Sequence, residues 1–192
     1  MIRARVYMLV AGLGLLGLLA AGCQSMPFHG KHFAGVTEAV AVLQPTKGSM
    51  VTGTVRFLQQ GDEVRIVAEV AGLKPSARHA MHVHEFGDIT SPDGTCAGGH
   101  YNPDGYPHAG PDTAKRHAGD LGNLIADDRG NAHYELVVDN LSVAGARNPV
   151  IGRGIVVHAG TDDYTTQPTG NAGARAAVGV IGIAMVMPAG KK

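Results

Sequence analysis

The sequence has no excess of charge of either sign and no long basic run in the part after residue 22. Sixteen lysine and arginine residues balance sixteen aspartate and glutamate residues. Proteins that bind nucleic acid or an anionic lipid surface usually carry a basic patch, so neither is indicated as a partner of the folded part. Charge alone therefore does not identify a ligand.

Tryptophan is absent, and no segment has the long 3.6-residue period of an amphipathic helix. Glycine, in contrast, occurs 28 times, and short apolar or alternating segments are separated by turn residues. These segments predict strands at 37–44, 50–59, 62–73, 79–86, 121–127, 131–138, 154–160 and 177–186. We therefore expect an all-β fold of eight antiparallel strands, arranged as a sandwich or flattened barrel.

Cysteine is scarce, with only Cys23 and Cys96. Two arginines, an apolar run at 6–21 that is short for a membrane span, and Ala-Ala-Gly precede Cys23. This pattern predicts a signal peptide at 1–22 and resembles a bacterial lipobox, with cleavage before Cys23 and lipid attached to it. Ordinary cleavage nearby, giving a soluble secreted protein, is the alternative. If Cys23 carries lipid, Cys96 has no partner within the chain.

The segment 23–36 contains glycine and proline without periodicity and predicts a lipid-anchored tether. Residues 37–192 then form one domain, which is long enough for a real core. We expect the protein at the cell envelope, facing the periplasm and attached to a membrane through Cys23. Gln24 rather than aspartate follows Cys23, which hints at the outer membrane.

Two long segments, 87–120 and 160–176, are rich in Gly, Pro, Asp, Thr and His and do not read as strands. Loops longer than about 15 residues in a compact domain are usually functional or disordered, and these residue types favour function.

Six histidines fall in two strands and one of these loops: His82, His84, His100, His108, His117 and His158. In "HVH", His82 and His84 share one face of a strand, whereas Val83 points to the other face and is expected to lie in the core. Copper(II) favours imidazole nitrogens in a tetragonal set, and structural zinc favours a closed tetrahedral set that can include a carboxylate such as Asp120.

One site of each kind would need seven imidazole contacts from six histidines, so one ring would have to bridge the two metals. A single zinc site would need only four of these seven groups. The residues by themselves leave both arrangements open.

The segments "HVHEFGD", "GGHYNP", "RHAGDLGNL", "VVHAGTDD" and "TGNAGARAAVGVIGIA" closely resemble copper/zinc superoxide dismutase from about residue 38 to 187, here in a bacterial lipoprotein-type form. The resemblance implies a Greek-key barrel with two functional loops. It also implies one copper and one zinc per subunit. The redox-cycling copper would dismutate superoxide to dioxygen and hydrogen peroxide beside a structural zinc, protecting the cell envelope.

The resemblance also assigns residues. Copper would be held by His82, His84, His100 and His158, and zinc by His100, His108, His117 and Asp120. His100 would bridge the metals and carry a proton during turnover. Arg175 would guide the anionic substrate, although an unaligned loop arginine is usually only solvated. Asp162 would link a copper-ligand histidine to a zinc-ligand histidine, and Thr169 would lie at the rim of the substrate channel.

Two further histidines receive no metal. His79 lies three residues before His82, on the opposite face of the strand, and is expected to be a packed structural histidine. His133 is expected to be exposed.

The sequence departs from the family pattern at its disulfide. The resemblance places a cysteine three residues after the guiding arginine, where this chain has Val178, and Cys96 approximates the loop cysteine that would pair with it. The intrasubunit disulfide is therefore impossible, and we expect Cys96 to be a free thiol. The segments 150–153 and 179–184 resemble a dimer surface, so a homodimer is an expectation, although such apolar segments are also ordinary core.

The rival function is a non-catalytic copper or zinc buffer or chaperone on the same fold. Arg175 argues against it, because a buffer needs no cation that guides a substrate.

Overall fold

The computed structural model describes residues 33 and 35–186, which belong to a unit that spans Lys31–Lys192. The predicted signal peptide and most of the predicted tether, including Cys23, lie outside the described residues. No helix in the described part is long and apolar enough to cross a membrane.

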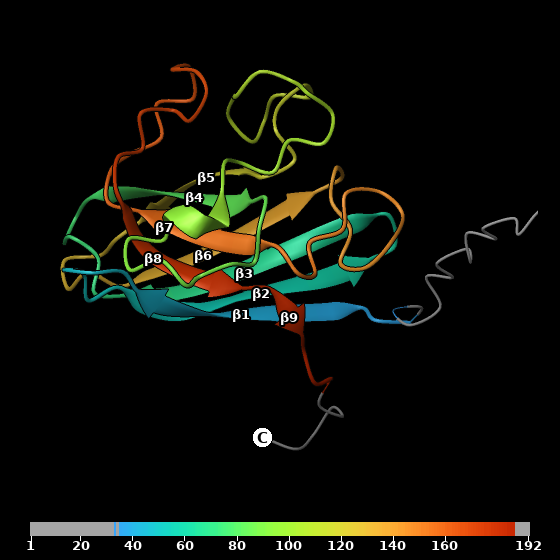
Figure 1. Ribbon diagram of the computed structural model, residues 1–192, viewed down its shortest axis with the longest axis horizontal. Helices are drawn as coiled ribbons and strands as arrows, with labels where there is room; N and C mark the ends of the chain where they lie inside the picture. Colours follow the sequence, from blue (N-terminus) through green and yellow to red (C-terminus); the bar gives the residue numbers. More distant parts are fainter. Residues whose placement is uncertain (1–32, 34, 187–192) are drawn as a thin grey trace, which may run out of the picture. The chain divides into compact units, whose positions relative to one another are not determined.

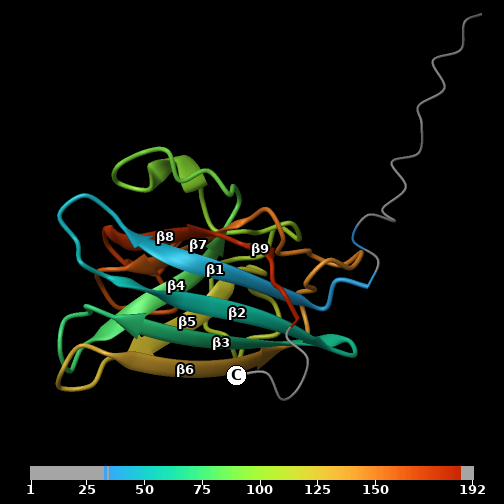
Figure 2. The same ribbon diagram turned by 90° about the horizontal axis from the view of Figure 1, so that it is seen from below.

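The strands form one sheet that curls into a flattened, nearly closed barrel. In Figure 2, β1, β2, β3 and β6 lie side by side in front of β4, β5, β7 and β8. Their bounds are β1 (Glu38–Pro45), β2 (Thr52–Gln60), β3 (Glu63–Ala71), β4 (Arg78–His84), β5 (Asp120–Ile125), β6 (Ala132–Val138), β7 (Gly154–His158), β8 (Arg175–Val180) and β9 (Gly182–Ile183).

The strand order is β5-β4-β7-β8-β1-β2-β3-β6, with the short β9 paired to β1, and all of these pairs are antiparallel. The two ends of this order approach each other, because the hydroxyl of Tyr134 in β6 donates to the carbonyl of Leu121 in β5 at 2.5 Å. The predicted all-β fold of eight antiparallel strands is confirmed.

One boundary differs from the prediction, because the segment expected as a single strand at 177–186 is divided into β8 and β9. At the break, the Ile181 N–H donates to the Arg153 carbonyl at 2.9 Å, and the Ile181 carbonyl accepts from Gly152 N–H at 2.8 Å. The backbone of Ile181 therefore pairs with the segment before β7 and leaves the ladder with β1. The sequence stays apolar through Ile181, so the hydrophobic pattern gives no sign that the strand breaks there.

Alternation along the strands places the core inside the barrel. In β3, for example, Val64, Ile66, Ala68 and Val70 are buried, and the residues between them are not. Strand β4 departs from this rule, since every residue from 79 to 84 is buried. Met81 and Val83 pack in the main core, which confirms the prediction for Val83.

The outer face of β4 is buried because two long loops cover it. The loop 85–119 follows β4 and contains the short 3-10 helix η2 (Thr95–Ala97), and the loop 159–174 follows β7, the strand beside β4. Both loops rise on the same side of the barrel (Figure 1). The covered face carries His82 and His84, so the fold creates a buried polar layer between barrel and loops.

Candidate metal centre

The structure brings the predicted metal-binding residues together in two groups. In each group, one candidate ligand atom from every residue lies within 4.8 Å of the others, and all of the residues are buried. The first group is His82, His84, His100 and His158, and the second is His100, His108, His117 and Asp120. These are the two sets that the resemblance implied.

Each ring of the first group has one buried nitrogen without a hydrogen-bond partner, namely Nδ1 of His82 and Nε2 of the other three. The opposite nitrogen of three rings donates a hydrogen bond, from His82 to Asp162 Oδ2 at 2.8 Å, from His84 to the Gly98 carbonyl at 2.9 Å and from His158 to the Gly173 carbonyl at 3.2 Å. Because these oxygens accept, the hydrogen sits on the outward nitrogen and the lone pair stays free.

Four buried lone pairs without partners are costly in a protein interior, and they form the donor set that copper(II) favours. The residues present therefore fit a copper ion. They fit it without a rearrangement of tautomers, because the outward hydrogen bonds already fix the ring orientations.

His100 belongs to both groups. Its Nε2 is the unpartnered nitrogen of the first group, and its Nδ1 lies 2.9 Å from Asp120 Oδ1 and 3.4 Å from His117 Nδ1. The two ring nitrogens thus face the two groups. This geometry matches the bridging ring that the count of seven contacts from six histidines requires.

Asp120 lies at the centre of the second group. Its Oδ1 is 2.9 Å from Nδ1 of His108 and 3.3 Å from Nδ1 of His117, and its Oδ2 accepts from backbone N–H groups of Ala109 and His117 at 3.1 Å. Burial by itself would raise the pKa of Asp120, but the hydrogen bonds from the histidines outweigh it and hold the pKa well below its usual range. Three nitrogens and one carboxylate oxygen are a donor set typical of zinc.

The carboxylate of Asp162 joins the two groups. Its Oδ2 lies 2.8 Å from His82 Nε2, and its Oδ1 lies 2.8 Å from His108 Nε2. Burial by itself would raise the pKa of Asp162, but the hydrogen bonds with His108 and His82 outweigh burial and lower it. The structure thus places Asp162 where the resemblance expected a link between the metal sites.

Electrostatics separates His108 from the histidines of the first group. Burial lowers the pKa of His84 to about 2, of His158 to about 3 and of His100 to about 4, and it also lowers the pKa of His82. These rings are neutral at pH 7, which is the form that binds metal. Burial alone would also lower the pKa of His108, but its hydrogen bonds to Asp120 and Asp162 raise it to about 9.

Arg175 opens β8 and lies opposite His158 across the β7–β8 pair. Its guanidinium donates to the carbonyls of Gly94 and Gly98. The positive charge of Arg175 is among the causes that lower the pKa values of His84 and His158, after their burial. The cation is therefore close to the first group, and burial lowers its own pKa.

The remaining predicted residues have clear positions. Thr169 is half-buried in the turn before Gly170. His79 is buried and donates from Nδ1 to the His158 carbonyl at 2.9 Å, so the prediction of a packed structural histidine is confirmed. His133 is exposed as expected, with Nδ1 2.6 Å from Glu69 Oε1.

The position of Cys96 corrects one expectation. Within the described residues Cys96 is exposed and forms no disulfide. Cys96 does not approximate the loop cysteine, because the loop residue that faces Val178 is Gly94. Cys96 lies two positions later in the loop, where it is exposed.

Sequence reasoning missed Asn123, Gln167 and Gly170, which bind or contact the backbone and side chains of His108 and Asp162. Asn123 and Gly170 lie inside the motifs that resemble the family, but a single sequence does not separate them from ordinary polar and turn residues.

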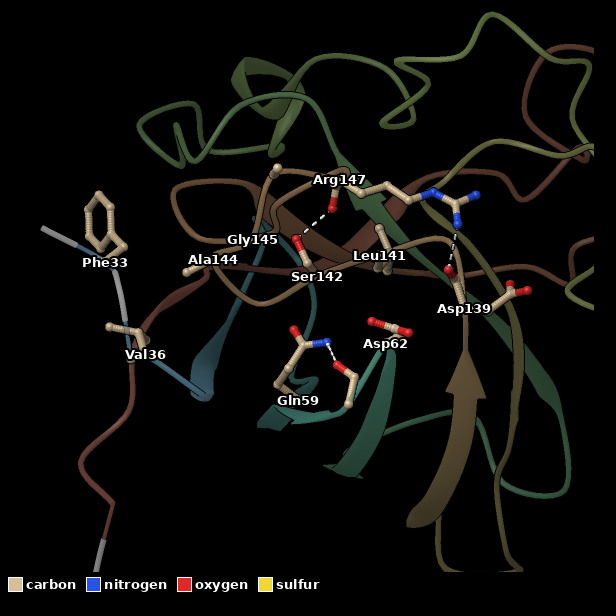
Figure 3. Close-up of a pocket in the computed structure, with 13 residues that line it drawn as sticks. Phe33, Val36, Gln59, Asp62, Asp139, Leu141, Ser142, Ala144, Gly145 and Arg147 are labelled. Atoms are coloured by element: carbon tan, nitrogen blue, oxygen red, sulfur yellow. Dashed lines mark hydrogen bonds between the residues drawn. The ribbon is translucent and has the colours of Figure 1, made fainter. Parts of the chain in front are cut away.

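Figure 3 shows a cavity of about 620 Å³ that is lined by none of the residues of this centre. Its polar groups largely satisfy one another. The hydroxyl of Ser142 donates to the Arg147 carbonyl at 2.5 Å, and Arg147 Nη1 donates to the Asp139 carbonyl at 2.9 Å. Because it shares no residue with the two metal groups, the cavity is not part of the metal centre.

Comparison with known proteins agrees with this geometry. The family model for copper/zinc superoxide dismutase (SODC) matches residues 51–181. A Cu-Zn superoxide dismutase of Paramecium bursaria Chlorella virus 1 is 46% identical over 156 residues, covering 78% of this chain and 81% of that protein. The Cu-Zn superoxide dismutase of Schizosaccharomyces pombe is 44% identical over 158 residues, covering 78% and 100%.

A solved structure of the clock protein EA4 is also similar, with a TM-score of 0.69 and 38% identity, covering 77% of this chain and 95% of that one. As its motifs predicted, the chain belongs to the copper/zinc superoxide dismutase family, whose members use copper and zinc to convert superoxide to dioxygen and hydrogen peroxide.

Proposed function

We propose a division of roles among the residues of this centre in the dismutation of superoxide. The first group, His82, His84, His100 and His158, holds copper, and the second group, His100, His108, His117 and Asp120, holds zinc. The observation that carries this assignment is the set of four buried imidazole nitrogens, one from each ring of the first group, that have no partner.

A bound copper ion supplies the one-electron oxidation of one superoxide and the one-electron reduction of a second. The protein supplies position and protons. When its Nε2 is not bound to copper, His100 would hold a proton at that atom and deliver it to the reduced substrate, because its Nδ1 stays engaged with Asp120 and His117. The second group thereby fixes the ring that moves the proton. The second proton of hydrogen peroxide would come from solvent.

Arg175 attracts the substrate anion toward the first group. This enzyme class is a standard example of electrostatic steering, in which a charged cleft raises association rates by roughly 10- to 1000-fold. The guanidinium is held by the carbonyls of Gly94 and Gly98, so its charge is fixed beside the site.

The assignment is tested by measuring dismutation by the chain expressed from Gln24 and loaded with copper and zinc. Arg175→Ala should lower the activity by about tenfold or more and flatten its salt dependence. Arg65→Ala is the matched control, because Arg65 is exposed and pairs with Glu135 on the sheet surface. Metal bound in the expected ratio without copper-dependent turnover would instead favour the buffer or chaperone.

We also propose that the chain is exported and anchored by lipid at Cys23, and that it protects the cell envelope from the extracytoplasmic side. The apolar run at 6–21 and Ala-Ala-Gly before Cys23 support this. Cys23→Ala should move the protein from the membrane fraction to the soluble fraction with its specific activity unchanged. Recovery of the full-length, unprocessed chain from the cytoplasm would contradict the proposal.

A homodimer through the face that carries Phe86, Val180 and Ile183 is the third proposal. These side chains are 56%, 40% and 54% exposed. Phe86 is next to Gly87, whose added Cβ would lie 3.0 Å from Val180 Cγ1, so Phe86 and Val180 adjoin, and Ile183 follows Val180 by three residues. Exposed apolar patches of this kind often mark an interface. Phe86→Asp should convert a dimer into a monomer in analytical ultracentrifugation, whereas a wild-type monomer would refute the proposal.

A further inference from the structure

Two carboxamide side chains each bind both the N–H and the C=O of one residue of the metal centre. Asn123 Oδ1 accepts from the Asp162 N–H at 2.8 Å, and Asn123 Nδ2 donates to the Asp162 carbonyl at 3.0 Å. Gln167 Oε1 accepts from the His108 N–H at 2.8 Å, and Gln167 Nε2 donates to the His108 carbonyl at 2.8 Å. We call Asn123 and Gln167 the carboxamide clamps.

The two clamped residues are themselves joined, since His108 Nε2 lies 2.8 Å from Asp162 Oδ1. Each clamp connects segments that are distant in the sequence. Asn123 reaches 39 residues, from β5 to the loop 159–174, and Gln167 reaches 59 residues, from that loop to the loop 85–119. Together they tie both loops to each other and to the barrel.

Asn123 attaches this hydrogen-bond network to the sheet. It is buried in β5, three residues after Asp120, and it pairs with Ala80 of β4. Its Nδ2 also donates to the Tyr164 hydroxyl at 2.9 Å, and the Tyr164 N–H donates to Asp162 Oδ1 at 2.7 Å. The direction of the Asp162 carboxylate is therefore fixed at its backbone and at its side chain.

We infer that Asn123 and Gln167 are positioning residues that fix the Asp162 carboxylate between His82 and His108, and so set the ligand geometry of both metal groups before metal binds. The inference rests on the metal assignment proposed above. Partners that orient metal ligands in this way typically contribute 10- to 100-fold in metal affinity. The clamps do this in a chain that lacks the disulfide expected near the loop 85–119.

The test uses the mature chain with cobalt(II) in place of zinc, because the visible bands of cobalt(II) report ligand geometry. Gln167→Ala should shift these bands and weaken zinc binding by roughly 10- to 100-fold in competition with a chelator. Gln167→Glu keeps the acceptor for the His108 N–H but loses the donor, so its effect should be intermediate. Asn123→Ser should also shift the cobalt bands and weaken zinc binding. If this variant does not fold, the two Gln167 variants alone test the inference.

Gln59→Ala is the matched control. Gln59 Nε2 donates to the carbonyls of Gly61 at 2.9 Å and Glu63 at 3.1 Å, and its Oε1 accepts from the Val143 N–H at 2.8 Å. It is therefore also a carboxamide that ties backbone segments, but it lines the separate cavity of Figure 3. Its loss should lower stability and leave the cobalt bands and the zinc affinity unchanged.

Wild-type cobalt bands and zinc affinity in both Gln167 variants would overturn the inference, and so would an equal change in Gln59→Ala. A wild-type chain that binds no cobalt(II) in the zinc group would instead overturn the metal assignment. The two failures are therefore distinguishable.

Discussion

Gly94 and Val178 face each other so closely that a Cβ atom added to Gly94 would lie 2.6 Å from Val178 Cγ1. Position 178 is where the family resemblance places the second cysteine of its disulfide, and Gly94 is the loop residue opposite it. The pair leaves the loop close to β8 without a covalent bond. Arg175 reinforces the contact by donating to the Gly94 carbonyl.

We predict that the double variant Gly94→Cys with Val178→Cys forms a disulfide. In a disulfide, the Cβ of one cysteine lies about 3 Å from the sulfur of the other, close to the separation here. The gain should be roughly 2 kcal/mol, less than the roughly 4.6 kcal/mol expected for closing so long a loop, because φ at Gly94 is 76° and a side chain there is strained. Urea unfolding with and without reductant measures it.

Val178→Cys alone is the control and should not pair with Cys96, which is exposed. A double variant whose stability does not depend on reductant would contradict the prediction.

The residues by themselves indicated a metal site, and the resemblance to a known family supplied the two ligand sets. His82 and His84 share a strand face, and Asp120 follows His117 at short range. The motifs around Arg175 and Asp162 carried the rest. The break at Ile181 could not be predicted, because it depends on which distant backbone competes for its N–H and C=O.

The carboxamide clamps could not be predicted from the sequence either, because they also depend on contacts between distant segments. Asn123 and Gln167 act through hydrogen bonds to residues 39 and 59 positions away, and such pairs exist only once both loops fold over β4. Gly94 shows the same limit, since the sequence suggested Cys96 for the place opposite Val178 and the structure has Gly94 there.

Gly170→Ala should disrupt the link between the two metal groups. A Cβ at this position would overlap Asp162 Oδ1 and lie 2.6 Å from His108 Nε2, and φ is 65°. We expect zinc affinity to fall by roughly 10- to 100-fold in a chelator competition. Gly61→Ala is the control, because its φ is 63° and a Cβ there meets nothing within 4 Å. Equal zinc affinities in the two variants would refute the steric argument.

His133 should titrate at a higher pH than an ordinary histidine. Its hydrogen bond to Glu69, at 2.6 Å, is the main cause of its raised pKa. Glu69→Gln should lower the pKa of His133 toward its usual value, and added salt should act in the same direction because the pair is exposed. Glu135→Gln should have a smaller effect, since Glu135 Oε1 lies 3.4 Å from the ring. The pH dependence of the His133 imidazole NMR shifts measures the effects of Glu69→Gln, of salt and of Glu135→Gln. An unchanged titration midpoint of His133 in Glu69→Gln would contradict this account.

The stability of the metal-free protein should be highest near pH 6.5. The pKa values of His84, His158 and His100 are lowered to about 2, 3 and 4. Below the ordinary value of about 6.5 the unfolded chain binds protons that the folded chain excludes. Stability should therefore fall as the pH drops, by up to about 1.4 kcal/mol per pH unit for each histidine.

His108 acts in the opposite direction. Its pKa is raised to about 9, so the folded chain keeps a proton that the unfolded chain loses between about pH 6.5 and 9. Its contribution is complete below pH 6.5 and is lost as the pH rises through 9. Urea unfolding of the metal-free protein at pH 5, 6.5 and 8.5 should thus show a maximum at the middle value. His108→Asn should remove the alkaline decline and keep the acid one, because the neutral rings of the first group are unchanged. A stability that rises steadily from pH 5 to 8.5 in the wild-type protein would show that the hydrogen bonds of Asp120 and Asp162 do not hold the proton on His108.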